Sequence, residues 1–146
     1  VLLKGHGTEN FMVLESGRSG INLVGDQRAA VSGDFDRDGM SDLVVTRNNG
    51  KTGLFLNKSQ KIGLRVVVQG AGGNTHGIGS VLRLKYHDGM GPARQITGSS
   101  GYRSQGSSIQ VLHATRPVES VWIQKPDGKI LTHEIKKGTH EVRITY

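Results

Sequence analysis

The apolar residues of this chain fall in short runs, and turn-forming Gly, Asn, Asp and Ser separate one run from the next. In residues 81–86 and again in 142–146, apolar and polar side chains alternate one by one, which is the period of a half-buried β-strand. Few stretches show helical periodicity. The 22 glycines among 146 residues favour turns over helix interiors. The chain is therefore predicted to be all-β.

Ten segments are predicted to form strands. They are Phe11–Leu14, Ala29–Ser32, Leu43–Thr46, Leu54–Asn57, Arg65–Gln69, Val81–Tyr86, Arg94–Thr97, Val118–Lys125, Ile130–Ile135 and Val142–Tyr146. Three dipeptides mark tight hairpin turns between them, because Asn, Asp and Gly tolerate positive φ. These turns are Asn49-Gly50, Asp88-Gly89 and Asp127-Gly128.

The formal charge of +7 belongs entirely to one half of the chain. Residues 1–60 hold seven basic and seven acidic residues, whereas residues 61–146 hold twelve basic and five acidic ones. The polar stretch Asn57–Gly63 lies where this balance changes, so we predict two units, residues 1–60 and residues 61–146. The basic half is either a surface for an anionic partner or a solvated face.

Several classes of protein are excluded by residues that the sequence lacks. Without any Cys, the chain has no disulfide, no thiolate zinc site and no cysteine nucleophile. No apolar run approaches ~18 residues, so no membrane span is expected. Recognition motifs for nucleic acid are missing and aromatic residues are sparse, so no nucleic-acid partner is expected. The first residue is Val1 rather than Met, and we expect a fragment or a processed form.

The sharpest motif is the acidic stretch from Asp34 to Asp42. Carboxylates occupy its first, third, fifth and ninth positions, and a glycine stands at the sixth. This is the ligand spacing of a calcium loop, in which alternate side chains converge on the ion and the seventh carbonyl adds an oxygen. Hard oxygen donors without nearby His or Cys favour Ca²⁺ over a transition metal. The candidate ligands are Asp34, Asp36, Asp38, Asp42 and the carbonyl of Met40.

An EF-hand is excluded for this stretch. That loop needs a bidentate Glu at its last position, where Val45 stands, and helices on both sides, where the sequence is strand-like. An acidic surface turn without a metal is the alternative, since Asp and Gly favour turns. Four carboxylates this close together repel one another unless a cation is present, which favours calcium.

Residues 29–57 carry a longer pattern around this loop. The stretch Ala-Ala-Val-Ser-Gly-Asp-Phe-Asp-Arg-Asp-Gly-Met-Ser-Asp-Leu-Val-Val-Thr is followed by Gly-Leu-Phe-Leu-Asn, which ends at Asn57. It resembles an FG-GAP/VCBS repeat, a family that builds β-propeller blades. The resemblance implies an antiparallel blade-like sheet whose loop binds calcium. Residues 5–14 are similar to the tail of a preceding blade.

Residues 64–128 carry three further pieces in order. They are Gly73-Asn-Thr-His-Gly-Ile-Gly-Ser-Val81, Gly98-Ser-Ser-Gly-Tyr-Arg-Ser-Gln105, and Val118-Glu-Ser-Val-Trp-Ile123 followed by Pro126-Asp-Gly128. Together they resemble the ASPIC/UnbV domain, which typically follows such repeats in secreted proteins. The resemblance implies a small β-sandwich or barrel and no reaction mechanism. The segment Val111–Ala114 departs from the glycine-containing pattern of that family.

We therefore expect a non-catalytic, calcium-binding interaction module that is secreted, periplasmic or at the cell surface. Its partner would be a protein or a carbohydrate outside the cell. A single blade leaves apolar faces uncovered, so we also expect contact with the second unit and a tendency to form a homodimer. Tyr102, Arg103 and Gln105 are candidate ligand contacts because loops often carry function.

Two alternatives stay open. The basic second unit could bind an anionic polysaccharide, in which case salt would weaken the binding. The Gly98–Gln105 loop could belong to a hydrolase, although no nucleophile and base are assembled in the sequence. The scattered histidines give no sign of such a pair.

Overall fold

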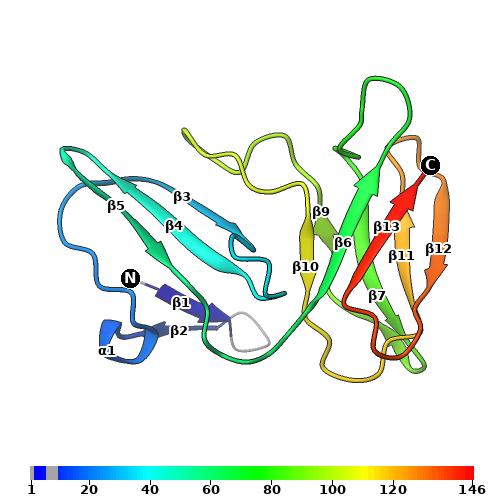
Figure 1. Ribbon diagram of the computed structural model, residues 1–146, viewed down its shortest axis with the longest axis horizontal. Coiled ribbons are helices and arrows are strands. Elements are labelled where there is room, and N and C mark those ends of the chain that lie inside the picture. Colours follow the sequence, from blue (N-terminus) through cyan, green and yellow to red (C-terminus); the bar gives the residue numbers. More distant parts are fainter. Residues whose placement is uncertain (1, 6–9) are drawn as a thin grey trace.

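The computed structural model describes residues 2–5 and 10–146 and is almost entirely β (Figure 1). In this part of the chain, the elements are β1 (Leu2–Gly5), β2 (Phe11–Leu14), α1 (Ser16–Ser19), β3 (Gln27–Gly33), β4 (Asp42–Arg47), β5 (Gly50–Phe55), β6 (Leu64–Gln69), β7 (Val81–Tyr86), β8 (Gly89–Met90), β9 (Arg94–Gln95), β10 (Gln110–Leu112), β11 (Ser120–Gln124), β12 (Ile130–Glu134) and β13 (Glu141–Thr145). No helix in the described residues is long and apolar enough to cross a membrane. The predicted all-β class is confirmed.

The N-terminal part contains a hairpin and a small sheet. β1 and β2 pair antiparallel, and β3, β4 and β5 form a separate three-stranded antiparallel sheet in that order. Of the segment 5–14, Gly5 ends β1 and Phe11–Leu14 forms β2, while residues 6–9 lie outside the described residues. Among the described residues before β6, Met40 and Val45 are the buried apolar side chains. This part therefore has little core of its own.

The C-terminal part is built from two sheets that share one core. One sheet has the order β10-β6-β13, and the other has the order β12-β11-β7-β8, with β9 also paired to β7. In β6, the buried residues alternate along the strand, and β7 and β13 show the same alternation. Because every second side chain points to the same face, each strand turns one apolar row inward.

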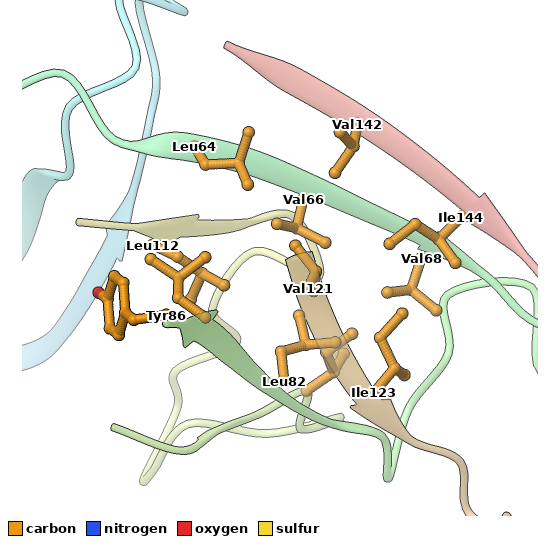
Figure 2. Close-up of a cluster of buried hydrophobic side chains, with 12 residues drawn as sticks. Leu64, Val66, Val68, Leu82, Tyr86, Leu112, Val121, Ile123, Val142 and Ile144 are labelled. Atoms are coloured by element: carbon orange, nitrogen blue, oxygen red, sulfur yellow. The ribbon is translucent and has the colours of Figure 1, made fainter. Parts of the chain in front are cut away.

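Figure 2 shows the apolar rows of the two sheets pointing toward each other. The core residues are Leu64, Val66, Val68, Leu82, Leu84, Tyr86, Ile96, Leu112, Val121, Ile123, Val142 and Ile144. All of them belong to residues 64–146, so this part has a core independent of the preceding sheet. The arrangement is a small β-sandwich with one parallel pair, β6 with β13.

Every predicted strand lies within or overlaps an observed one. Only Phe11–Leu14 and Val81–Tyr86 have the observed bounds, and the others differ by one to four residues at one or both ends. Leu54–Asn57 was expected, whereas β5 is Gly50–Phe55, because Asn49 at φ 50° makes a tight turn and Gly50 already pairs with Arg47. Asn57 then leaves the strand. The expected strand Arg94–Thr97 is only β9, Arg94–Gln95, although the N–H of the buried Ile96 still donates to the carbonyl of Ser80 at 2.9 Å. The short elements β1, β8, β10 and α1 were not expected.

Candidate metal site and ligand loop

The acidic loop connects β3 to β4 as a series of tight turns. Gly39 has φ 81° and Arg37 has φ 62°, so two residues take the left-handed conformation. The Asp36 carboxylate accepts a hydrogen bond from the Asp38 N–H at 3.3 Å, and the Asp38 carboxylate accepts one from the Met40 N–H at 2.9 Å. Such Asx turns are the local reason that an Asp-rich, Gly-containing segment folds back on itself.

Two carboxylates of the loop are buried and tie its ends together. Asp42, which is 2% exposed, accepts hydrogen bonds from the N–H of Phe35 at 2.9 Å and from the N–H of Asn57 at 2.8 Å. Asp34 accepts the N–H of Gly39 at 3.1 Å. The Asn57 amide in turn donates to the carbonyl of Ser41 at 3.1 Å. The segment after β5 therefore fixes the start of β4.

Three of the four predicted carboxylate ligands converge. Asp34, Asp36 and Asp42 each offer an oxygen, and these oxygens lie within 4.8 Å of one another. Asp38 is not part of this group, and one of its oxygens, Oδ1, accepts the N–H of Met40. The side chain of Met40 is buried.

A cation from the sandwich reaches this loop. Arg65, in β6, donates one hydrogen bond to Asp34 and another to Glu141 of β13, the latter at 3.0 Å. The side chains of Arg65 and Asp34 are 11% and 2% exposed. Burial by itself would lower the pKa of Arg65, but the hydrogen bonds and charges of the two acids outweigh it and raise that pKa. Arg65 therefore stays charged and offsets part of the loop's negative charge.

The second carboxylate oxygen of Asp34 takes no part in these hydrogen bonds. While Oδ2 accepts from Arg65 and Gly39, Oδ1 is buried and has no hydrogen-bond partner. A buried carboxylate oxygen without a partner is costly, so such atoms usually face a donor, a water or a cation. Asp34, which carries this oxygen, belongs to the three-carboxylate group, and all donors of the group are hard oxygens, so the residues suit Ca²⁺.

Sequence reasoning missed Arg65 and did not assign Asn57 a role in the site. Arg65 is a single charge inside the apolar run of β6, and that isolation was the available signal. Asn57 was noted only as the late Asn of the repeat pattern. Both act across long sequence separations of 31 and 15 residues, which local motifs do not reveal.

The predicted ligand loop is a tight turn whose tip is exposed. The N–H of Ser100 donates to the carbonyl of Ser104 at 3.1 Å, and Gly101 bridges to Ser104. Tyr102 at the tip is 73% exposed, so its ring does not pack inward. The Arg103 guanidinium lies 5.2 Å from the centre of that ring.

Gln105 is also exposed. Tyr102 and Arg103 line a hollow that they share with Arg28 of β3 and Arg47 of β4, and Gln105 does not line it. Two serine hydroxyls of this loop bond within its own turn. Ser99 donates to the carbonyls of Gly101 and Ser104, at 3.3 and 3.4 Å, and Ser104 donates to that of Tyr102 at 3.2 Å.

Comparison with known proteins adds no assignment. No protein-family model matches this chain. No curated protein matches it either.

Proposed function

We propose that this chain is a non-catalytic interaction module of the secreted type, in which the Asp34–Asp42 loop holds a structural calcium ion. The observation that carries the proposal is the unpartnered, buried Oδ1 of Asp34, a residue that belongs to a group of three converging carboxylates. The resemblance to an FG-GAP/VCBS blade followed by an ASPIC/UnbV domain supports the same reading, as does the three-stranded antiparallel sheet around the loop.

Asp34, Asp36 and Asp42 would supply the first ligands, and the Met40 carbonyl and Asp38 would complete the set. Asp34 can serve two cations at once, because Arg65 uses Oδ2 and leaves Oδ1 for the metal. Asp42 already accepts two backbone hydrogen bonds, which hold its carboxylate in place. A divalent ion would neutralise the remaining repulsion and pin the β3–β4 connection.

The role of calcium in this proposal is to stabilise the fold. An ion that binds only the folded state adds RT ln(1 + [Ca²⁺]/Kd) to the free energy of unfolding. With a Kd of ~10⁻⁴–10⁻³ M, typical of extracellular modules, about 1 mM calcium adds roughly 0.5–1.5 kcal/mol. For a chain of this size, that corresponds to a rise in Tm of about 1–5 °C.

The test compares thermal unfolding by circular dichroism in about 1 mM CaCl₂, MgCl₂ or chelator. We expect calcium to raise Tm, magnesium to raise it less, and Asp36→Asn to abolish the calcium effect. Asp36→Asn keeps the oxygen that accepts the Asp38 N–H, so it removes charge rather than the turn. Asp26→Asn is the matched control, because Asp26 is an exposed carboxylate whose ion-pair partner is Arg28. Equal melting in calcium and in chelator would contradict the proposal.

A further inference from the structure

A second site, distinct from the acidic loop, lies where the tip of the 101–104 turn meets β3 and β4. In Figure 1, the yellow segment between β9 and β10 reaches out from the sandwich toward these strands. The hollow between them has a volume of about 420 Å³. Its lining residues are Arg28, Ala29, Thr46, Arg47, Asn48, Tyr102 and Arg103. Three arginines from three separate segments therefore surround one concave surface.

Two of these arginines have no acidic partner among the described residues. Arg28 pairs with Asp26 at 2.8 Å, whereas Arg47 and Arg103 form no ion pair in that part of the chain. Arg47 uses Nε and Nη1 to donate to the carbonyls of Lys51 and Val24, at 2.9 and 3.0 Å. Neutral carbonyls hold the guanidinium in place but do not cancel its charge. The hollow thus keeps a net positive charge that an anion would offset.

The turn that carries Tyr102 and Arg103 has a strained backbone. Arg103 takes φ 54°, a conformation that non-glycine residues adopt at a cost. This places the Tyr102 ring and the Arg103 guanidinium beside Arg28 and Arg47. Guanidinium groups suit sulfate, carboxylate and phosphate groups, and an exposed aromatic ring offers a flat apolar face.

A second, larger hollow lies between the same two segments. It has a volume of about 540 Å³, and like the first it has β3 on one side and the chain between β9 and β10 on the other. Its polar lining includes Ser32, Ser41, Arg94, Gln95, Thr97, Ser100, Ser107, Gln110 and His113. Hydroxyl and amide groups of this kind hydrogen-bond the hydroxyls of a sugar. Arg94 adds a cation to the second hollow, so a ligand that fills both hollows is extended, rich in hydroxyls and anionic along its length.

We propose that this surface binds an anionic polysaccharide, with its sulfate or carboxylate groups on the three arginines and a sugar face against Tyr102. The site joins both parts of the chain, so it differs from a surface of the basic sandwich alone. Nucleic acid is disfavoured because Tyr102 is the single Phe, Tyr or Trp in the described lining of either hollow, whereas single strands need successive aromatic platforms. This inference rests on the proposed role as an interaction module, but not on the calcium ion.

The test is titration calorimetry of the full chain with a heparin oligosaccharide, an unsulfated polygalacturonate oligosaccharide and a single-stranded oligonucleotide. We expect the heparin oligosaccharide to bind, with an affinity that falls as salt rises. Arg103→Gln should weaken this binding about tenfold, and Tyr102→Ala should weaken it while Tyr102→Phe should not. Arg47→Gln should act in the same direction, but Arg103→Gln is the decisive variant because Arg103 is exposed and supports no other segment.

The matched control is the double variant Lys136→Gln, Lys137→Gln. These exposed lysines border a different hollow, on the sandwich alone. If the lysine variant weakens heparin binding and Arg103→Gln does not, the site is overturned. If the oligonucleotide binds more tightly than the oligosaccharides, the ligand class is overturned. If neither oligosaccharide binds at low salt, both the site and the ligand class are overturned. Binding to polygalacturonate alone would support the site and assign the carboxylate as its anion.

Each titration is repeated in calcium and in chelator, at a temperature where circular dichroism shows a folded protein. Binding that is equal in both supports this inference even if the melting experiment finds no calcium effect. A calcium effect on melting together with absent oligosaccharide binding overturns this inference and leaves the calcium proposal standing.

Discussion

Arg65 of the sandwich donates a hydrogen bond to the buried carboxylate of Asp34 in the acidic loop, 31 residues earlier in the chain. The same guanidinium binds Glu141 on the neighbouring strand β13. One side chain thus holds an acid from each part of the chain. The electrostatics of the loop therefore depend on a strand that lies outside the acidic stretch Asp34–Asp42.

Replacing Arg65 by Gln should destabilise the fold. The Asp34 carboxylate would stay buried without its cation, and breaking a buried pair in this way costs about 3 kcal/mol. The calcium-dependent rise in Tm should become larger in this variant, because the ion would meet a less compensated carboxylate. Urea unfolding and thermal melting with and without calcium measure the two effects.

The control for this variant is Arg143→Gln, since the Arg143 side chain is 65% exposed and pairs with Glu141 from the outside. It should change the unfolding free energy by less than about 1 kcal/mol. An Arg65→Gln protein as stable as the wild type would contradict the assigned role of the Arg65–Asp34 pair.

The Arg65–Glu141 contact predicts a pH dependence. The hydrogen bond from Arg65 lowers the pKa of Glu141 below its ordinary value of 4.5. A lowered pKa in the folded state stabilises the protein above that ordinary value and loses the contribution as pH falls through the folded pKa. Glu141 is 35% exposed, so the contribution is below about 1 kcal/mol. Glu141→Gln should destabilise at pH 7, and denaturant titrations should show this difference shrinking toward acid pH.

Alanine variants of two glycines distinguish the cost of backbone strain from the cost of a steric clash. Gly77 and Gly72 have nearly equal φ of 61° and 62°. A Cβ at Gly77 would lie 2.5 Å from Cγ1 of the buried Val68, whereas a Cβ at Gly72 meets nothing within 4 Å. Both alanine variants share the cost of a left-handed residue, about 1 kcal/mol, and Gly77→Ala adds overpacking of about 1–3 kcal/mol. Equal melting temperatures for the two variants would contradict this packing.

The shared core predicts the cost of cavities. Ile123 is fully buried between the sheets, so Ile123→Ala should lower the unfolding free energy by about 2–5 kcal/mol. Ile130 is 62% exposed on β12, and Ile130→Ala should change it by less than about 0.5 kcal/mol. Chemical denaturation of the two variants gives the comparison directly.

The sequence allowed prediction of the fold where the information is local. Val81–Tyr86 was predicted with the bounds of β7, because its apolar residues alternate and Asp88-Gly89 marks the turn. The three residues of β10 were missed, since Gln110–Leu112 is too short to show a period and is defined by its pairing with β6. The bounds of β5 failed because Gly50 and Gly53 have little strand propensity, and pairing with β4 overrides it.

The same distinction applies to the candidate sites. Asp34, Asp36 and Asp42 lie close in sequence, so spacing alone predicted their convergence. Arg65 could not be placed against Asp34 without the packing of the loop on β6. Tyr102 and Arg103 were singled out by their loop, but the arginines beside them, Arg28 and Arg47, come from strands far away in the sequence.

The parallel pairing of β6 with β13 has a consequence for biosynthesis. Arg65 on the first strand of the sandwich pairs with Glu141 on the last, and they are 76 residues apart. On the ribosome, one edge of β6 keeps its backbone hydrogen-bonding groups unpaired until β13 has emerged, because that neighbour in the sheet is made last. Such long-range pairing slows folding and leaves an unpaired strand edge exposed to other chains. We therefore expect the sandwich to fold after synthesis of β13 and to benefit from chaperones that shield the unpaired edge of β6.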